Sequence, residues 1–163
     1  MVKLIRLDER LIHGQVAIKW SRLLGVNRIV VADDEASSNP IMQQALMMAA
    51  PSGIKVVIVD VEKAVSLCND PRAGKLSILL IVSNPESLLR VVKGLDSLPE
   101  INIGNYGRVA PKREGGERRA LDKNLYVDAD EAQCLREAAS LATRCVVQTL
   151  PDETPVDLER LLG

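Results

Sequence analysis

Four short runs of apolar, mostly β-branched residues most strongly limit the folds that this chain can adopt. They span Val2–Leu7, Arg28–Ala32, Lys55–Asp60 and Ser77–Val82, and they show little alternation of apolar with polar side chains. Such runs are typical of strands that are buried on both faces of a parallel sheet. We expect further strands at Glu100–Gly104, Leu125–Val127 and Arg144–Leu150.

Segments with helical periodicity separate these runs. Val16, Trp20, Leu23 and Leu24 share one helical face, and Gly25 follows as a C-terminal stop. Further helices are predicted at Ile41–Ala50, at Asn84–Gly94 with Asn84 as N-cap, and at Ala132–Ala142 after a capping box of Asp128 and Glu131. The alternation predicts an α/β fold with a mostly parallel sheet, helices on both faces, and one domain over residues 1–163.

Composition and charge argue against several functional classes. A formal net charge of −1, the absence of Phe and the presence of only one Trp and two Tyr are unlike a nucleic-acid-binding protein. Cys68, Cys134 and Cys145 lie far apart and form no C-x-x-C, so we expect reduced thiols in a cytoplasmic protein. No apolar run approaches the roughly 20 residues of a transmembrane helix, and the N-terminus does not resemble a signal peptide.

Several common active-site motifs are also absent. The chain has no G-x-G-x-x-G, no Walker A motif and no G-x-S-x-G elbow. With one histidine and no cysteine pair, it gives no basis for a transition-metal site. The acidic turn Asp33–Glu35 could hold Mg²⁺, but nothing in its spacing demands it. We therefore expect no metal and no cofactor.

The loop after the first predicted strand carries the candidate chemistry, because ligands in open α/β sheets bind at the carboxyl ends of strands. His13, the only histidine, lies just before a predicted helix N-terminus, which favours an anion. Gly14 permits close approach of a ligand to the backbone, and Arg10 and Arg6 can supply positive charge. We expect these groups to keep His13 neutral and nucleophilic near pH 7, which suits phosphoryl transfer.

The same residues allow other interpretations. His13 with Asp8 or Asp34 could form the acid–base pair of a soluble enzyme, or the chain could be a regulatory module that does no chemistry. A lone loop histidine is more often structural, and Asp33, Asp34 and Glu35 most often form an N-capping turn. Elsewhere we expect Met42, Met47 and Met48 to fill the core, and Cys68 to be a buried thiol rather than a phosphocysteine. Tyr106–Arg119 is expected to be a long loop or irregular hairpin. Its basic run Lys112–Arg119 is expected to be solvated, with contact to an acidic partner or a phosphate as the less favoured alternative.

The segment Arg6–Val16, followed by Trp20, resembles the signature of the IIB components of the mannose/fructose/sorbose family, which belong to the bacterial phosphoenolpyruvate-dependent sugar phosphotransferase system. The resemblance spans essentially the whole chain, continuing through Ile29–Asp34, Met48–Pro51, Lys55–Glu62, Ser83–Pro85, Asn102–Gly104 and Val147–Pro151. It implies a largely parallel α/β sheet with flanking helices, in agreement with the pattern above.

The resemblance also implies a function. His13 would accept a phosphoryl group on Nδ1 from the phosphohistidine of a separate IIA component, and pass it to a sugar carried through the membrane IIC/IID complex. Arg10 would bind the phosphoryl group, and Asp8 would brace the loop or Arg10. The remaining candidates are Arg6, Gly14 and Gln15 as phosphoryl-binding or loop-bracing residues, and Asp34, Ser83 and Asn105 at the rim of the site.

The implied protein is cytoplasmic, associates peripherally with the permease, and could form a homo-oligomer. The chain departs from the family pattern in two places. Ala36-Ser37-Ser38-Asn39 stands where Val-Ala-Asn-Asp is common, and Asn102–Asn105 stands where Asn-Val-Gly-Gly is common. Both lie at the expected mouth of the site and bear on the identity of the sugar, which the sequence does not name.

Overall fold

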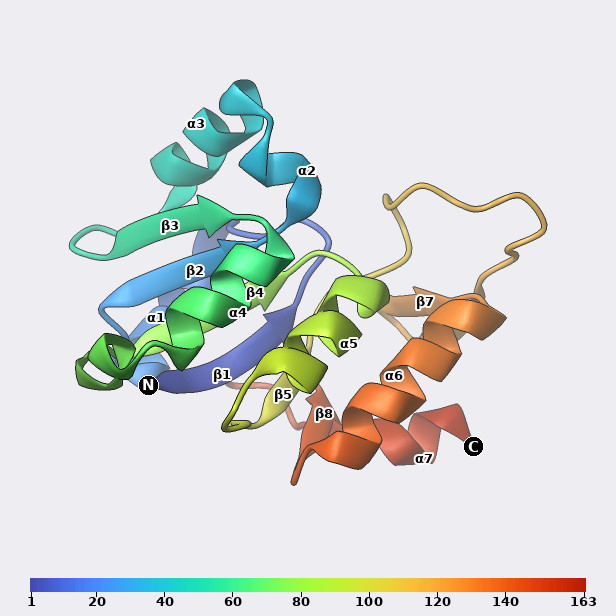
Figure 1. Ribbon diagram of the computed structural model, residues 1–163. Coiled ribbons are helices and arrows are strands. Elements are labelled where there is room, and N and C mark those ends of the chain that lie inside the picture. Colours follow the sequence, from blue (N-terminus) through green and yellow to red (C-terminus); the bar gives the residue numbers. More distant parts are fainter.

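The four continuous apolar runs form the adjacent parallel strands β1 (Val2–Leu7), β2 (Arg28–Ala32), β3 (Lys55–Val59) and β4 (Ile78–Val82). The computed structural model describes residues 1–163 and places these strands in a seven-stranded sheet of order β3-β2-β4-β1-β5-β8-β9 (Figure 1). β5 (Ile101–Ile103) and β8 (Cys145–Val147) continue it in parallel, and only β9 (Val156–Asp157) is antiparallel. The predicted mostly parallel sheet is confirmed.

Helices cover both faces of this sheet, as predicted (Figure 1). One face carries α1 (Gly14–Leu24), α2 (Asp34–Ser37) and α3 (Pro40–Ala49) over a cluster of 12 buried apolar residues. The other carries α4 (Val61–Asn69), α5 (Pro85–Gly94), α6 (Ala129–Leu141) and α7 (Leu158–Leu162) over a cluster of 26, and a 3₁₀ segment (Pro71–Lys75) follows α4. No helix of the structure is both long and apolar enough to cross a membrane.

Helix starts follow the predicted capping chemistry. The side chain of Asn84 accepts the amide of Ser87 at the start of α5, and Asp128 and Glu131 form the expected capping box of α6. Asp33 caps α2 by accepting the amide of Ala36 at 2.8 Å, which confirms the predicted N-capping turn. These short polar contacts are local, so the sequence is sufficient to predict them.

One predicted strand lies outside the main sheet, and one prediction needs correction. The strand expected over Leu125–Val127 is confirmed as β7, which pairs with β6 (Arg119–Asp122) in a separate antiparallel sheet. The prediction that the methionines fill the core is wrong for Met47 and Met48, whose exposed fractions are 50% and 81%. The reason is the position of α3, which lies at the margin of the sheet beyond β3 and buries only Leu46 (Figure 1).

The order of the strands also creates a crevice at their carboxyl ends. β1 leads into α1 on one face of the sheet, whereas its neighbour β4 leads into α5 on the opposite face. Adjacent strands whose connections leave in opposite directions open a space between their loops, which is where α/β proteins bind ligands. The loops after β1 and β4 are therefore the expected place of a ligand-binding site.

Candidate active site

The loop between β1 and α1 is held in one shape by its backbone and by two buried side chains. Leu11 (φ 58°) and Gly14 (φ 47°) both lie in the left-handed region, and the side chains of Leu11 and Ile12 are buried. A left-handed leucine costs roughly 1–2 kcal/mol, which burial of its side chain offsets. His13 follows as the extended N-cap of α1, and its side chain retains 16% exposure.

The imidazole of His13 contacts the carboxylate of Asp8. Nε2 of His13 lies 2.9 Å from Oδ2 of Asp8, which is fully buried and also accepts Nη2 of Arg6 at 3.0 Å and Nδ2 of Asn105 at 3.3 Å. Burial by itself would raise the pKa of Asp8, but the hydrogen bond from His13 and the charge of Arg6 outweigh it, and the pKa lies below its ordinary value. Asp8 is therefore ionised near neutral pH.

An ionised Asp8 decides which ring nitrogen of His13 carries the proton. Because a carboxylate can only accept, Nε2 must donate, and Nδ1 of the neutral ring keeps its lone pair. Nδ1 has no hydrogen-bond partner in the protein. The sequence analysis considered only the positive neighbours of His13. The structure adds the carboxylate of Asp8, which favours a proton on Nε2. The structure thus leaves Nδ1 without a partner in the protein.

Arg6 braces Asp8 from inside the protein. Its guanidinium is buried and donates to Asp8, to the side-chain oxygen of Asn102 and to the carbonyls of Gln148 (3.2 Å) and Thr149 (3.1 Å). It also lies over the ring of Trp20, 5.4 Å from the centroid, and Trp20 donates to the carbonyl of Thr149 at 2.9 Å. Of the two roles predicted for Arg6, these contacts support loop bracing rather than phosphoryl binding.

The other candidates of the loop face solvent. Arg10, Gly14 and Gln15 are exposed, and the guanidinium of Arg10 makes no hydrogen bond or ion pair, although its amide donates to Oδ1 of Asp8 at 3.1 Å. The amides of Gly14, Gln15 and Val16 find no acceptor in the protein, because they form the first turn of α1. A free guanidinium and free helix amides beside His13 can hold an anion.

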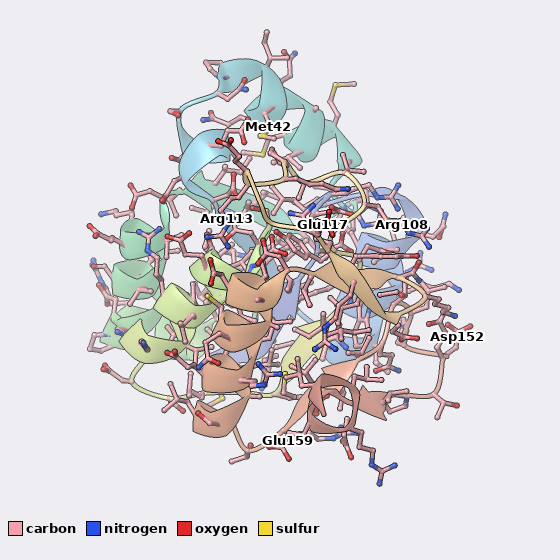
Figure 2. The ribbon with its side chains drawn as sticks, turned by 90° about the vertical axis from the view of Figure 1, so that its right-hand side faces the viewer. Met42, Arg108, Arg113, Glu117, Asp152 and Glu159 are labelled. Atoms are coloured by element: carbon pink, nitrogen blue, oxygen red, sulfur yellow. The ribbon has the colours of Figure 1, made fainter.

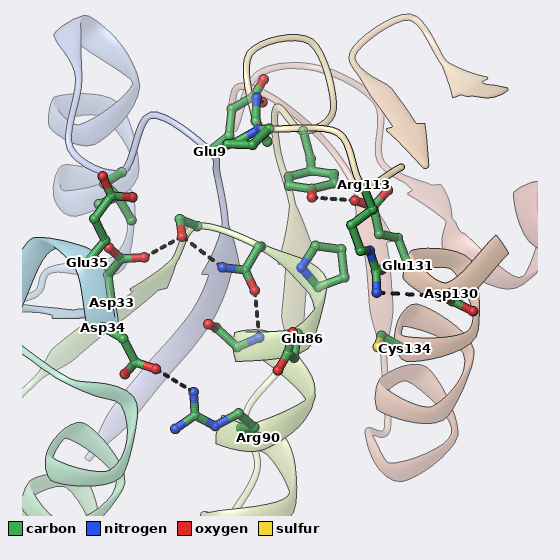
Figure 3. Close-up of a pocket in the computed structure, with 18 of the residues that line it drawn as sticks. Glu9, Asp33, Asp34, Glu35, Glu86, Arg90, Arg113, Asp130, Glu131 and Cys134 are labelled. Carbon is green, nitrogen blue, oxygen red and sulfur yellow. Dashed lines mark hydrogen bonds and ion pairs between the residues drawn. The ribbon is translucent and has the colours of Figure 1, made fainter. Parts of the chain in front are cut away.

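The rim candidates divide between two places. Asn105 joins the His13 site through its bond to Asp8. Asp34 and Ser83 instead line a cleft of about 770 Å³ in the crevice between β1 and β4, which Leu11 also lines but His13 does not (Figure 3). Asp34 accepts the amide of Val61 at 3.0 Å and pairs with Arg90 at 2.7 Å, and these two bonds lower its pKa. The structure therefore pairs His13 with Asp8 and not with Asp34.

Ser83 contacts the acidic turn that Asp33, Asp34 and Glu35 form. Its hydroxyl donates to Oδ1 of Asp33, the residue that caps α2 (Figure 3). In this way the loop after β4 is tied to the loop after β2. Ser83 thus has a structural partner and no contact with His13.

The sequence analysis did not identify Glu9 as a site residue. Glu9 joins the loop between β1 and α1 to the long loop that follows β5. Its carboxylate accepts the amides of Gly107 (3.1 Å), Val109 (3.1 Å) and Ala110 (2.9 Å). Gly107 has φ 97°, and a Cβ there would lie 1.9 Å from the carbonyl oxygen of Tyr126. Loop amides that follow a glycine often bind an anion together, so Gly107 was the only hint in the sequence that this loop holds a carboxylate. Nothing in the sequence indicates that the carboxylate is that of Glu9.

The predicted solvated basic run is wrong for Arg118. Its side chain is only 3% exposed, pairs with Glu131 at 2.8 Å, donates to the carbonyl of Ala110 at 2.7 Å, and stacks on Tyr106. Burial and the bond to Glu131 raise the pKa of Tyr106. The partner carboxylate comes from α6, so the sequence of the loop alone does not indicate that Arg118 is buried.

Burial disfavours the thiolate form of Cys68 and Cys145. Burial raises the pKa of the Cys68 thiol to about 11 and that of Cys145 to about 12. Both therefore stay protonated near neutral pH. Cys68 was expected to be a buried thiol; it is half-buried in α4 and packs against the core.

Comparisons with known proteins identify relatives of this chain. A family model described as the sorbose subfamily IIB component of the PTS system matches residues 2–163. A probable phosphotransferase enzyme IIB component of Streptococcus pyogenes serotype M6 is 37% identical over 164 residues, covering 100% of both chains. The mannose-specific EIIAB component of Escherichia coli K12 is 35% identical over 104 residues, which are 64% of this chain and 32% of that protein.

A solved structure is also similar. The IIBSor domain of the sorbose permease from Klebsiella pneumoniae matches with a TM-score of 0.88 and 27% identity, covering 99% of this chain and 96% of that chain. The similarity therefore extends over the whole sheet and over the loops that hold His13 and Asp8.

Proposed function

This chain belongs to the sorbose subfamily of IIB components of the bacterial phosphotransferase system, and we propose that His13 is the residue through which it transfers a phosphoryl group. The family expected from the segment Arg6–Val16 is confirmed, and with it a transferase role in sugar uptake. One observation carries the proposed role of His13. The buried carboxylate of Asp8 holds Nε2, and Nδ1 is left free on a partly exposed ring at a helix N-terminus.

In the proposed reaction, the lone pair of His13 Nδ1 forms a bond to the phosphorus of a donor phosphohistidine. The N–P bond of the donor breaks, and its electron pair returns to the donor ring. The ring of His13 becomes positively charged as it is phosphorylated, while its proton stays on Nε2 against Asp8. The negative charge of Asp8 stabilises this developing cation, as the aspartate does in a catalytic triad.

In this proposal the negatively charged phosphoryl group lies on the exposed side of the loop between β1 and α1. Arg10 can pair with the phosphoryl oxygens, and the amides of Gly14, Gln15 and Val16 can donate to them. Phosphoryl transfer depends mainly on such fixed positioning and charge stabilisation. Arg6 and Asn105 act indirectly, because both donate hydrogen bonds to Asp8 and hold it in place.

The donor in this proposal is a IIA component. The similarity to the mannose-specific EIIAB component supports this choice of donor, because that name denotes a IIA and a IIB component in one protein. The acceptor is a sugar within the membrane IIC/IID complex. Its hydroxyl oxygen would bond to phosphorus, the electron pair of the N–P bond would return to Nδ1, and the hydroxyl proton would pass to a base or to solvent. The chain would then work in the cytoplasm beside the permease.

The test is phosphorylation of the purified chain with phosphoenolpyruvate, enzyme I, HPr and the cognate IIA. We expect an acid-labile phosphate on His13, with ¹⁵N NMR assigning it to Nδ1, and no label on His13→Ala. Equal labelling of His13→Ala would refute the proposal. Turnover of a small substrate without any IIA would instead support the soluble acid–base enzyme, and docking of IIA without phosphate transfer would support a regulatory module.

A further inference from the structure

Asn102 leaves a buried hydrogen-bond donor unused. This residue lies in the middle of β5 and is fully buried, with 0% exposure. Nδ2 of Asn102 is one of two buried side-chain polar atoms that have no hydrogen-bond partner, and the other is Oγ of Ser21. A buried donor without a partner destabilises a fold by roughly 1–3 kcal/mol, so its presence needs a physical reason.

Arg6 forces this orientation of the amide. Nη1 of Arg6 donates to Oδ1 of Asn102. Because a guanidinium has donors only, the oxygen of Asn102 must face Arg6, and Nδ2 must point elsewhere. Turning the amide over would place two donors against each other. The unused donor is therefore the consequence of giving Arg6 an uncharged acceptor at this position.

An uncharged acceptor matters because Arg6 has a single charged partner. Its other acceptors are the carbonyls of Gln148 and Thr149, and only Asp8 carries a charge. An aspartate at position 102 would have the same size and no unused donor, but it would place a second carboxylate beside the guanidinium. Asn102 leaves the whole positive charge of Arg6 opposite Asp8. We call Arg6, Asp8 and Asn102 the buried cluster.

The remaining charges near the buried cluster lie outside it. Glu153 attracts the guanidinium of the cluster but pairs with Lys123 at 3.9 Å. Asp152, in the same loop, pairs with Lys19 at 3.7 Å, and Figure 2 shows Asp152 at the outer edge of the molecule. The exposed Arg10 donates only its backbone amide to the cluster. The buried cluster itself therefore contains one cation and one anion.

We propose that Asn102 is a positioning residue for phosphoryl transfer at His13, acting through its neutral amide. It orients Arg6 and keeps Asp8 the only carboxylate of the buried cluster. This inference rests on the proposed function of His13. A second carboxylate behind the imidazole would favour the imidazolium, in which both ring nitrogens carry protons and Nδ1 has no lone pair to attack phosphorus.

The first test is Asn102→Asp, which keeps the size of the side chain and adds a charge. ¹⁵N NMR follows the titration of His13 in the unphosphorylated chain, and the midpoint should move to higher pH by about one unit. Below both midpoints, labelling by IIA should be about ten-fold slower than in the native chain at the same pH, and above them it should return to the native rate. The control is Asn69→Asp, the same change at the last residue of α4, which should leave both measurements native.

The second test is Asn102→Leu, which keeps a similar volume and removes both the acceptor and the unused donor. Arg6 then loses one of its acceptors and holds Asp8 less firmly. Labelling should slow by about ten-fold or more at every pH, because small displacements of a reacting group are costly in rate. The control is Ser21→Ala, which removes the other buried polar atom without a partner and should leave the labelling rate native.

Native labelling of Asn102→Leu would overturn the inference. A native titration midpoint in Asn102→Asp would also overturn it, and so would labelling of Asn102→Asp that stays slow at high pH, because Asn102 would then only fill space.

These measurements separate the inference from the function on which it rests. If the native chain takes no label from IIA, the proposed function fails. The NMR titration needs no phosphoryl donor, so it still decides whether Asn102 sets the charge behind His13.

Discussion

The carboxylate of Asp8 lies 2.9 Å from Nε2 of His13, with Asp8 fully buried and the imidazole 16% exposed. This relationship places the fixed negative charge on the inner side of the ring and leaves Nδ1 without a hydrogen-bond partner in the protein. It also joins the partly exposed imidazole to Arg6, which in turn donates to Asn102 and to the carbonyl of Thr149. The orientation of His13 is therefore set by contacts with buried side chains.

Replacing Asp8 by Asn should slow phosphorylation of His13 by about 10²-fold, in the range of a positioned proton-handling group. The amide has no charge to stabilise the developing imidazolium and no longer fixes the proton on Nε2. Rapid-quench labelling by IIA measures the rate, and ¹⁵N NMR of His13 measures the tautomer. The control is Asp96→Asn, an exposed carboxyl on the opposite side of the molecule, which should leave both unchanged.

Acid should remove the stability that Asp8 contributes. The pKa of Asp8 in the folded protein lies below its ordinary value, so the unfolded chain binds this proton more readily. Its contribution is complete above the unfolded pKa of about 4 and is lost as the pH falls through the folded pKa. At neutral pH, Asp8→Asn should cost about 3–5 kcal/mol, because Arg6 loses its buried partner.

Urea unfolding of the native chain and of Asp8→Asn between about pH 3 and pH 7 tests this dependence. The difference in the free energy of unfolding should be constant above about pH 5 and should shrink below about pH 4. A difference that stays the same across the whole range would contradict the linkage.

Replacing Gly104 by Ala should displace Arg6. A Cβ at Gly104 would lie 2.2 Å from Nη2 and 2.6 Å from Cζ of the Arg6 guanidinium. Overpacking of this kind costs about 1–3 kcal/mol, and the loss of the brace on Asp8 should also slow phosphorylation. The matched control is Gly74→Ala, where no atom lies within 4 Å of the added methyl group. Native melting and labelling rates for Gly104→Ala would show that Arg6 can move without consequence.

Arg10 should affect transfer without affecting stability. Its exposed guanidinium makes no hydrogen bond or ion pair in the protein, so Arg10→Gln should change the free energy of unfolding by less than about 0.5 kcal/mol. The rate of phosphorylation should fall by about 10- to 10²-fold if the guanidinium pairs with the phosphoryl group. Arg22→Gln, at the far end of α1, supplies the control and should leave the rate unchanged. An unchanged rate for Arg10→Gln would remove Arg10 from the site.

Glu9→Gln should loosen the long loop after β5. The neutral amide accepts the amides of Gly107, Val109 and Ala110 less strongly than the carboxylate does. We expect hydrogen exchange of these amides to accelerate by about ten-fold or more, since local opening exposes them. Glu114→Gln, an exposed residue of the same loop, should leave their exchange at the native rate. Equal exchange in the two variants would show that Glu9 does not hold the loop.

The amino-acid pattern was sufficient to predict the parallel sheet, the helix caps and the place of His13 before the first helix. Continuous apolar runs such as Ile78–Val82 require burial on both faces, and caps such as Asn84 and Asp128 act on amides only three residues away. The segment Arg6–Val16 likewise identified the family, because its pattern is continuous along the chain. These features depend on neighbours in sequence, which a single chain displays directly.

Tertiary structure alone decided which partner each of these residues meets. Gly104 leaves room for Arg6, Glu131 neutralises Arg118, and Asp34 turns to Arg90 rather than to His13. The exposure of Met47 and Met48 likewise follows from the position of α3 at the edge of the sheet, beside strand β3. In each case the deciding contact joins residues that are distant along the chain, and its free energy depends on burial that only the packed sheet and helices create.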